Sequence, residues 1–108
     1  MRITDLVWLD ELVEKIEAKH GVFQGEVDEV FSRKPKIRRM KKGRFRGEDV
    51  YRALGRTEAG RYLAVFFIHK RTGAALILSA RDMDRKERKI YATKSIAWSQ
   101  TRAYAREL

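Results

Sequence analysis

The chain has 108 residues, of which 44% are hydrophobic, a size and composition that support a single compact domain over residues 1–108. No stretch approaches the roughly 20 apolar residues of a membrane span, and the acidic N-terminus lacks the basic-then-apolar order of a signal peptide, so a cytoplasmic protein is expected. The absence of cysteine excludes disulfides, thiolate metal sites and cysteine nucleophiles, and with only two histidines neither a metal site nor a cofactor is expected.

The formal net charge of +10 is unevenly distributed. Residues 1–31 hold eight acidic and three basic side chains, whereas residues 32–108 hold seven acidic and twenty-two basic ones. The densest part is the stretch 33–46, which has nine cations and no anion. Such a density attracts polyanions, so RNA or DNA is the expected partner, although a solvated basic loop that keeps a small protein soluble has the same pattern.

The first predicted elements are two amphipathic helices. Apolar residues from Leu9 to Ile16 recur at helical spacing until Gly21 stops the helix, and a second set runs from Phe23 to Phe31. Each helix therefore has one apolar face to bury against a sheet.

Three strands are predicted next, near residues 49–54, 61–69 and 74–81, with connections short enough for antiparallel hairpins. The middle strand is apolar on both faces and should be central. The basic stretch 33–46 favours a further, partly ordered strand, which gives a sheet of three to four strands. A last helix is predicted after Asp84, where Glu87 completes a capping box, with a helical extension over residues 92–108.

Several short motifs follow one another in a fixed order. The apolar strand that ends in Ser79-Ala80-Arg81 precedes a helix carrying Glu87-Arg88 and then Tyr91. The motifs upstream are Lys19-His20-Gly21-Val22, Glu26-Val27-Asp28-Glu29-Val30-Phe31, Ala53-Leu54-Gly55-Arg56-Thr57 and Gly60-Arg61-Tyr62-Leu63. Over most of residues 8 to 91 these motifs resemble the BrnT family of small ribonuclease toxins. The resemblance implies an α+β fold of the RelE/BrnT type, an endoribonuclease of a type II toxin–antitoxin system, and a cognate antitoxin protein as partner.

The resemblance also implies RNA cleavage without metal, in which a ribose 2′-hydroxyl attacks its neighbouring phosphate. This reaction needs a proton acceptor, a proton donor and cations that stabilise the developing negative charge. Arg81 is the first candidate for contacting the scissile phosphate. His20, Tyr91 and Glu48 are the candidates for proton transfer, although His20 at the end of a predicted helix also fits a purely structural role.

Eight further cations are expected to bind RNA, because guanidinium and ammonium groups pair with phosphate oxygens. They are Arg52, Arg61, Arg88, Arg38, Arg39, Lys41, Lys42 and Arg44. Phe45, within the same basic stretch, either stacks on a base or anchors its loop to the core.

The chain departs from the family pattern at two places. It has Asp49-Val50 where the family has an acidic residue followed by arginine, and Leu9 separates Trp8 from Asp10 in the usual Trp-Asp pair. Two alternatives to the toxin therefore stay open. One is an RNA- or DNA-binding module of the same fold without turnover, and the other is a protein-interaction module that uses its acidic helices or its Trp98-containing tail. Contact between acidic residues 1–31 and a basic region of another copy would give a homo-oligomer.

Overall fold

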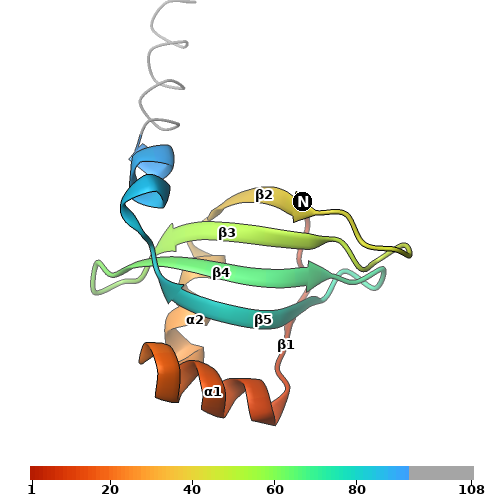
Figure 1. Ribbon diagram of the computed structural model, residues 1–108, viewed down its shortest axis with the longest axis horizontal. Helices are drawn as coiled ribbons and strands as arrows, with labels where there is room; N and C mark the ends of the chain where they lie inside the picture. The colour runs from red at the N-terminus through yellow and green to blue at the C-terminus, as the bar shows by residue number, and fades with distance from the viewer. Residues whose placement is uncertain (93–108) are drawn as a thin grey trace, which may run out of the picture.

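The computed structural model describes residues 1–92, which form one five-stranded sheet with helices (Figure 1). In chain order the elements are β1 (Leu6–Val7), α1 (Asp10–His20), α2 (Gln24–Ser32), β2 (Lys36–Lys41), β3 (Val50–Arg56), β4 (Tyr62–His69) and β5 (Ala75–Asp82), followed by helical residues 85–92. The predicted α+β class is confirmed. The predicted extension and its docking role concern residues beyond 92, outside the described residues. None of the described helices is long and apolar enough to cross a membrane.

The two N-terminal helices form where the sequence predicts them. α1 ends because Gly21 adopts the left-handed region at φ 62°, from which its N–H donates to the carbonyl of Glu17. The fully buried side chain of this helix is Ile16. At the start of α2, the N–H of Phe23 donates to the carboxylate of Glu26 at 3.1 Å. The Phe23 ring itself is exposed, so the apolar face of α2 begins further along the helix.

The sheet has the order β1-β5-β4-β3-β2, in which β1 runs parallel to β5 and the other neighbours are antiparallel. β4 is central, as its two apolar faces predicted. The predicted antiparallel sheet of three to four strands forms the main part of this sheet, and β1 adds a fifth strand that is parallel to its neighbour. Two residues, Leu6 and Val7, are too few to show the alternation that identifies a strand in a sequence. The basic stretch contributes β2, the opposite edge strand.

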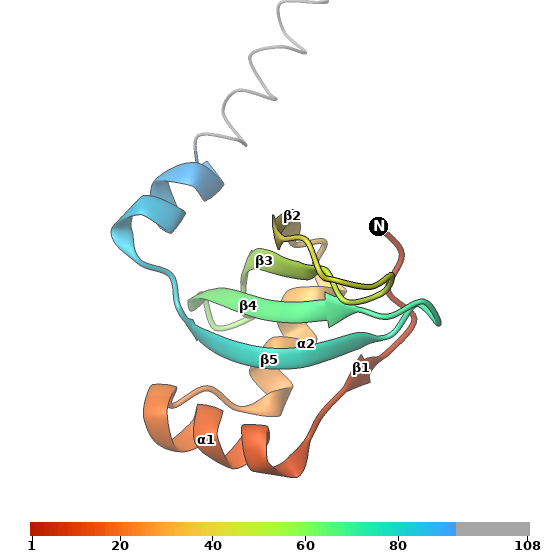
Figure 2. The same ribbon diagram turned by 45° about the vertical axis from the view of Figure 1, so that its right-hand side comes forward.

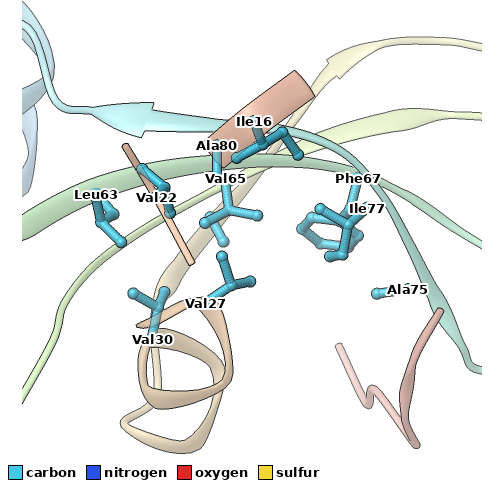
Figure 3. Close-up of a cluster of buried hydrophobic side chains, with 11 residues drawn as sticks. Ile16, Val22, Val27, Val30, Leu63, Val65, Phe67, Ala75, Ile77 and Ala80 are labelled. Atoms are coloured by element: carbon cyan, nitrogen blue, oxygen red, sulfur yellow. The ribbon is translucent and has the colours of Figure 1, made fainter. Parts of the chain in front are cut away.

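The main hydrophobic core lies between α1, α2 and one face of the sheet (Figure 3). Its fully buried members are Ile16, Val22, Val27, Val30, Ala53, Leu63, Val65, Phe67, Ala75, Ile77 and Ala80. The contact between α2 and β3 depends on Gly55, because a Cβ at this position would lie 2.9 Å from Cγ1 of Val30. α2 is thereby held close against the sheet.

Helical residues 85–92 cover one end of the opposite face of the sheet (Figure 2). The predicted capping box is present, since the N–H of Glu87 donates to Asp84 at 2.7 Å and the N–H of Asp84 donates to Glu87 at 3.0 Å. Behind this cap, Met83 and Ile90 pack with Leu54 in a second, smaller core. No other element of residues 1–92 covers this side of the sheet, which we call the open face.

Candidate nucleic-acid interface

The strand register places a set of cations together on the open face. One row across the sheet consists of Lys36, Leu54, Ala64 and Arg81, and the next consists of Arg38, Arg52, Phe66 and Ser79. Residues that pair across neighbouring strands point to the same side of the sheet, and so do residues two apart along a regular stretch of strand. Three of the arginines predicted to contact RNA therefore share one face.

At the centre of this face, Glu87 holds two arginines. Its carboxylate accepts both Nη groups of Arg81, at 2.6 and 3.0 Å, and lies 3.6 Å from Nη1 of Arg52. The Glu87 and Arg52 side chains are only 5% and 9% exposed, whereas that of Arg81 is 33% exposed. The hydrogen bond to Glu87 raises the pKa of Arg81 above its ordinary value. We call these three residues the Arg81–Glu87–Arg52 cluster.

Arg81, the partly exposed member of the cluster, has N–H donors left to bind an anion. The hydrogen bonds of Arg81 to Glu87 and to the carbonyl of Asp82 use three of its five N–H groups. Nε of Arg52 is buried and has no hydrogen-bond partner within residues 1–92. Two guanidinium groups face one carboxylate, so the cluster retains a net positive charge.

Glu87 is the residue that sequence reasoning missed as part of the site. Its position three residues after Asp84 identified it only as a helix cap, and it does cap the helix through Oε1. The same oxygen also accepts from Arg81. The sequence carries no sign of this second contact, because it depends on the helix folding back over β5.

Beside the cluster, Tyr62 carries two cations on its ring. Cζ of Arg56 lies 4.7 Å from the ring centroid and Cζ of Arg88 lies 4.3 Å from it. Both arginines are exposed, and neither forms an ion pair within residues 1–92. Arg88 thus reaches the open face, and so does Arg56, the last residue of β3.

Tyr91 joins the helical residues to the edge strand across the same face. Its ring meets that of Tyr62 edge-on at a centroid distance of 6.0 Å. Nζ of Lys36 donates to the Tyr91 carbonyl at 2.7 Å and lies 4.9 Å from the ring centroid. The Tyr91 ring, the two arginines on Tyr62 and the Arg81–Glu87–Arg52 cluster therefore all lie on the open face of the sheet.

Arg61 does not belong to this surface, and its role in binding RNA stays a prediction. Its guanidinium donates to Asp82 at 2.7 and 3.2 Å and to Glu26 at 3.1 and 3.2 Å. It also donates to the carbonyls of Gly21 and His20, at 2.9 and 3.2 Å. The hydrogen bond with Asp82 raises the pKa of Arg61 above its ordinary value and holds that of Asp82 below its usual range. Arg61 thus ties α1, α2 and β5 together.

Two of the proton-transfer candidates lie away from Arg81. His20 ends α1 on the helix side, where its positive form contributes to lowering the pKa of Asp82. Glu48 is exposed in the loop before β3 and does not start the strand, which begins at Val50. Since β3 and β5 run in the same direction, Glu48 lies at the end of the sheet opposite Arg81. Of the three candidates, the structure brings only Tyr91 to the open face.

The remaining predicted cations also extend towards that far end. Arg39 pairs with Asp49 at 3.5 Å, on the side of β2 opposite Arg38. Lys41 ends β2, and Lys42 and Arg44 lie in the loop that follows. These four cations therefore do not converge on Arg81. Residues 1–92 hold no group of three His, Asp or Glu side chains placed to bind a metal ion.

The sheet has α1 and α2 on one face, and cations and tyrosines on the other, and so defines a small α+β domain with a basic, aromatic surface. Residues 8–87 match the family described as "Ribonuclease toxin, BrnT, of type II toxin-antitoxin system". The match spans well over half of the chain, so the protein belongs to this family. A ribonuclease toxin of such a system acts on RNA and is paired with an antitoxin, and the family implies both as partners.

The fold agrees with a solved structure of the same family. The ribonuclease toxin BrnT of Brucella abortus, determined by crystallography at 1.1 Å, superposes with a TM-score of 0.60 and is 20% identical in sequence. The match covers 76% of this chain and 99% of the Brucella protein. No curated protein sequence matches the chain. The recognition of a BrnT-like toxin and of its fold is thereby confirmed.

Proposed function

We propose that the protein is a toxin endoribonuclease that binds RNA on the open face and cleaves it without metal. The ribose 2′-hydroxyl gives up its proton as its oxygen attacks the neighbouring phosphorus, and the bond from phosphorus to the 5′-oxygen of the next nucleotide breaks as that oxygen takes up a proton. The observation that carries this proposal is the Arg81–Glu87–Arg52 cluster, a fixed and partly exposed group of cations. Fixed cations stabilise charge that develops on the phosphate oxygens, because they need no reorganisation when the reaction occurs.

In this proposal Arg81 contacts the scissile phosphate with its free N–H groups, and Glu87 positions Arg81. A bidentate carboxylate keeps a guanidinium in one orientation, which is what Glu87 does at 2.6 and 3.0 Å. Arg52 offers the second cation of the face. It lies two residues after Val50, and Val50 stands at the position where the family has its arginine. Tyr91 is the proton-transfer residue, since it shares the open face with Arg81.

The antitoxin is proposed to cover the same cationic face. Arg38, Arg56 and Arg88 are exposed there and form no ion pair within residues 1–92. An acidic partner surface would associate rapidly with them and would exclude RNA at the same time.

A binding module without turnover is the second candidate. Val50 replaces the family's arginine at the start of β3, and Glu87 already occupies part of the hydrogen-bonding capacity of Arg81. Such a protein would bind RNA in a salt-dependent way and leave it intact.

The deciding experiment measures cleavage of a labelled RNA in EDTA by the wild type and by Arg81→Ala, Arg81→Lys and Tyr91→Phe. Arg33→Ala, an exposed arginine on the helix side, removes the same charge as Arg81→Ala and serves as control. Arg81→Ala and Tyr91→Phe should each lower kcat about a hundredfold or more, whereas Arg33→Ala should not. Arg81→Lys keeps the charge and tests the need for the planar fork.

Circular dichroism confirms that each variant is folded. RNA binding without cleavage by the wild type would favour the binding module, and loss of cleavage by EDTA would refute the metal-independent mechanism.

A further inference from the structure

The end of the sheet opposite Arg81 carries a second group of cations. The β2–β3 loop (42–49) and the β4–β5 loop (70–74) extend side by side beyond the strands (Figure 1). They are in contact, since a Cβ on Gly47 would lie 2.9 Å from Cγ of Arg71, and Arg46, Lys70 and Arg71 line one pocket. We call the exposed side chains of Lys42, Arg44, Phe45, Arg46, Lys70 and Arg71 the distal cluster.

The distal cluster carries an excess of positive charge, since its five cations face only the carboxylates Glu48 and Asp49 within the same two loops. None of its five cations forms an ion pair within residues 1–92. The neighbouring Asp49 is already engaged, because one oxygen accepts the N–H of Gly43 at 2.6 Å and the other pairs with Arg39. Gathering an excess of like charges costs free energy, which binding of a polyanion would offset.

An aromatic ring stands exposed among these cations. Phe45 is 66% exposed and lies directly between Arg44 and Arg46. The interpretation that Phe45 anchors its loop to the core is therefore wrong. A ring flanked by cations offers a stacking surface for a base and ion pairs for the adjoining phosphates, which is the combination that binds single-stranded nucleic acid. An acidic protein partner would form ion pairs with the cations, but its charged surface would offer no apolar patch against which the Phe45 ring could pack.

We propose that the distal cluster is a second RNA-binding site, which holds the substrate strand at a distance from the cleavage site. This inference rests on the proposed ribonuclease function for the identity of the ligand. From Ala64, opposite Arg81, to Lys70 the strand advances about 20 Å at roughly 3.3 Å per residue. A stacked strand advances about 3.4 Å per nucleotide, so an RNA of roughly six nucleotides or more reaches both sites.

The test compares the wild type with the triple variant Lys42→Ala, Arg44→Ala, Arg46→Ala, and with Phe45→Ala. A second triple variant, Lys15→Ala, Lys19→Ala, Arg33→Ala, removes three exposed cations on the helix side and serves as the charge-matched control. Binding is measured with a 12-nucleotide RNA whose 2′-oxygens are methylated, since it cannot be cleaved by 2′-hydroxyl attack. Cleavage is measured separately with unmodified RNAs of 4 and 12 nucleotides.

The loop triple variant should bind the 12-mer at least tenfold more weakly. The slope of log K against log salt should fall in magnitude by about 2, because each of the three lost contacts to a single strand contributes roughly 0.7. Phe45→Ala should weaken binding about tenfold with little change in that slope. With cleavable RNA, KM for the 12-mer should rise with kcat unchanged, and kcat/KM for the 4-mer should stay unchanged.

Equal losses for the loop and control triple variants, or for the 4-mer and the 12-mer, would overturn the proposal in favour of non-local electrostatics. If the loop triple variant loses binding to an acidic antitoxin but keeps its RNA affinity, the distal cluster binds a protein and the proposal is overturned. If the wild type cleaves no RNA, the proposed function fails, whereas the binding measurements still decide the role of the distal cluster.

Discussion

Replacing Glu87 by glutamine should strongly destabilise the fold. The carboxylate is 5% exposed, accepts two hydrogen bonds from Arg81, and is the counter-charge of Arg52, whose side chain is 9% exposed. A glutamine keeps one acceptor but turns two donors towards arginine donors, which leaves Arg52 buried without an anion. Removing one partner of a buried ion pair costs about 3–5 kcal/mol. Because Arg81 is one-third exposed and solvent screens its share, we expect about 2–4 kcal/mol.

Urea unfolding followed by circular dichroism measures this change. The expected loss is a large part of the ~5–15 kcal/mol that stabilises a typical domain, so the midpoint should fall clearly with an unchanged m-value. Glu58→Gln, at an exposed loop position, is the matched control. Adding Arg52→Met to Glu87→Gln should recover part of the loss, because both buried charges are then gone. A loss below about 1 kcal/mol, or one equal to that of Glu58→Gln, would refute the view that the cluster is electrostatically tight.

Three further predictions concern other parts of the structure. Gly55→Ala should cost about 1–3 kcal/mol in thermal unfolding, because its Cβ would meet Val30 at 2.9 Å; a change below about 0.5 kcal/mol would show that α2 can shift. Since the pKa of Asp82 is lowered by Arg61, their stabilisation is full above about pH 4 and is lost as pH falls through the lowered pKa. The difference in unfolding free energy between wild type and Asp82→Asn should therefore vanish in acid, and a difference that persists would contradict this. Arg88→Ala should weaken RNA binding about three- to tenfold in a fluorescence titration at low salt, with an unchanged melting temperature; unchanged affinity would exclude it from the interface.

Most of the fold follows from local patterns in the sequence. The helices were predictable from apolar spacing and from Gly21, and the three long strands from short apolar runs between turns. What the sequence could not show is β1, whose two residues pair with β5 from far along the chain. β2 was predicted only as a partly ordered strand within the basic stretch, because four of its six residues are exposed at the edge of the sheet and Ile37 is its one apolar residue that packs against the core.

The site was predictable as residue types but not as a constellation. Arg61 and Arg52 look alike in the sequence, as cations on adjacent predicted strands. In the predicted strand 61–69, Arg61 shares its side with Leu63 and Val65, which point to the helix side. Because this strand is apolar on both faces, its alternation could not show which side faces the helices. The distinction needed the tertiary structure, in which Asp82 and Glu26 hold Arg61 below the sheet.

A bulge in β5 explains why Arg81 lies on the open face. Ala75 and Ile77 point into the core, so strict alternation would send Arg81 to the same side. The register shifts between Phe66 and Phe67, where Phe66 pairs with Ser79 and Phe67 with Ile77, so that one extra residue stands in β5. After this extra residue the alternation is inverted and Arg81 joins Arg52 on the open face. This one-residue irregularity, which no periodicity in the sequence reveals, thus brings Arg81 into the Arg81–Glu87–Arg52 cluster. Bulges are frequent next to active sites because they redirect a side chain without ending the strand.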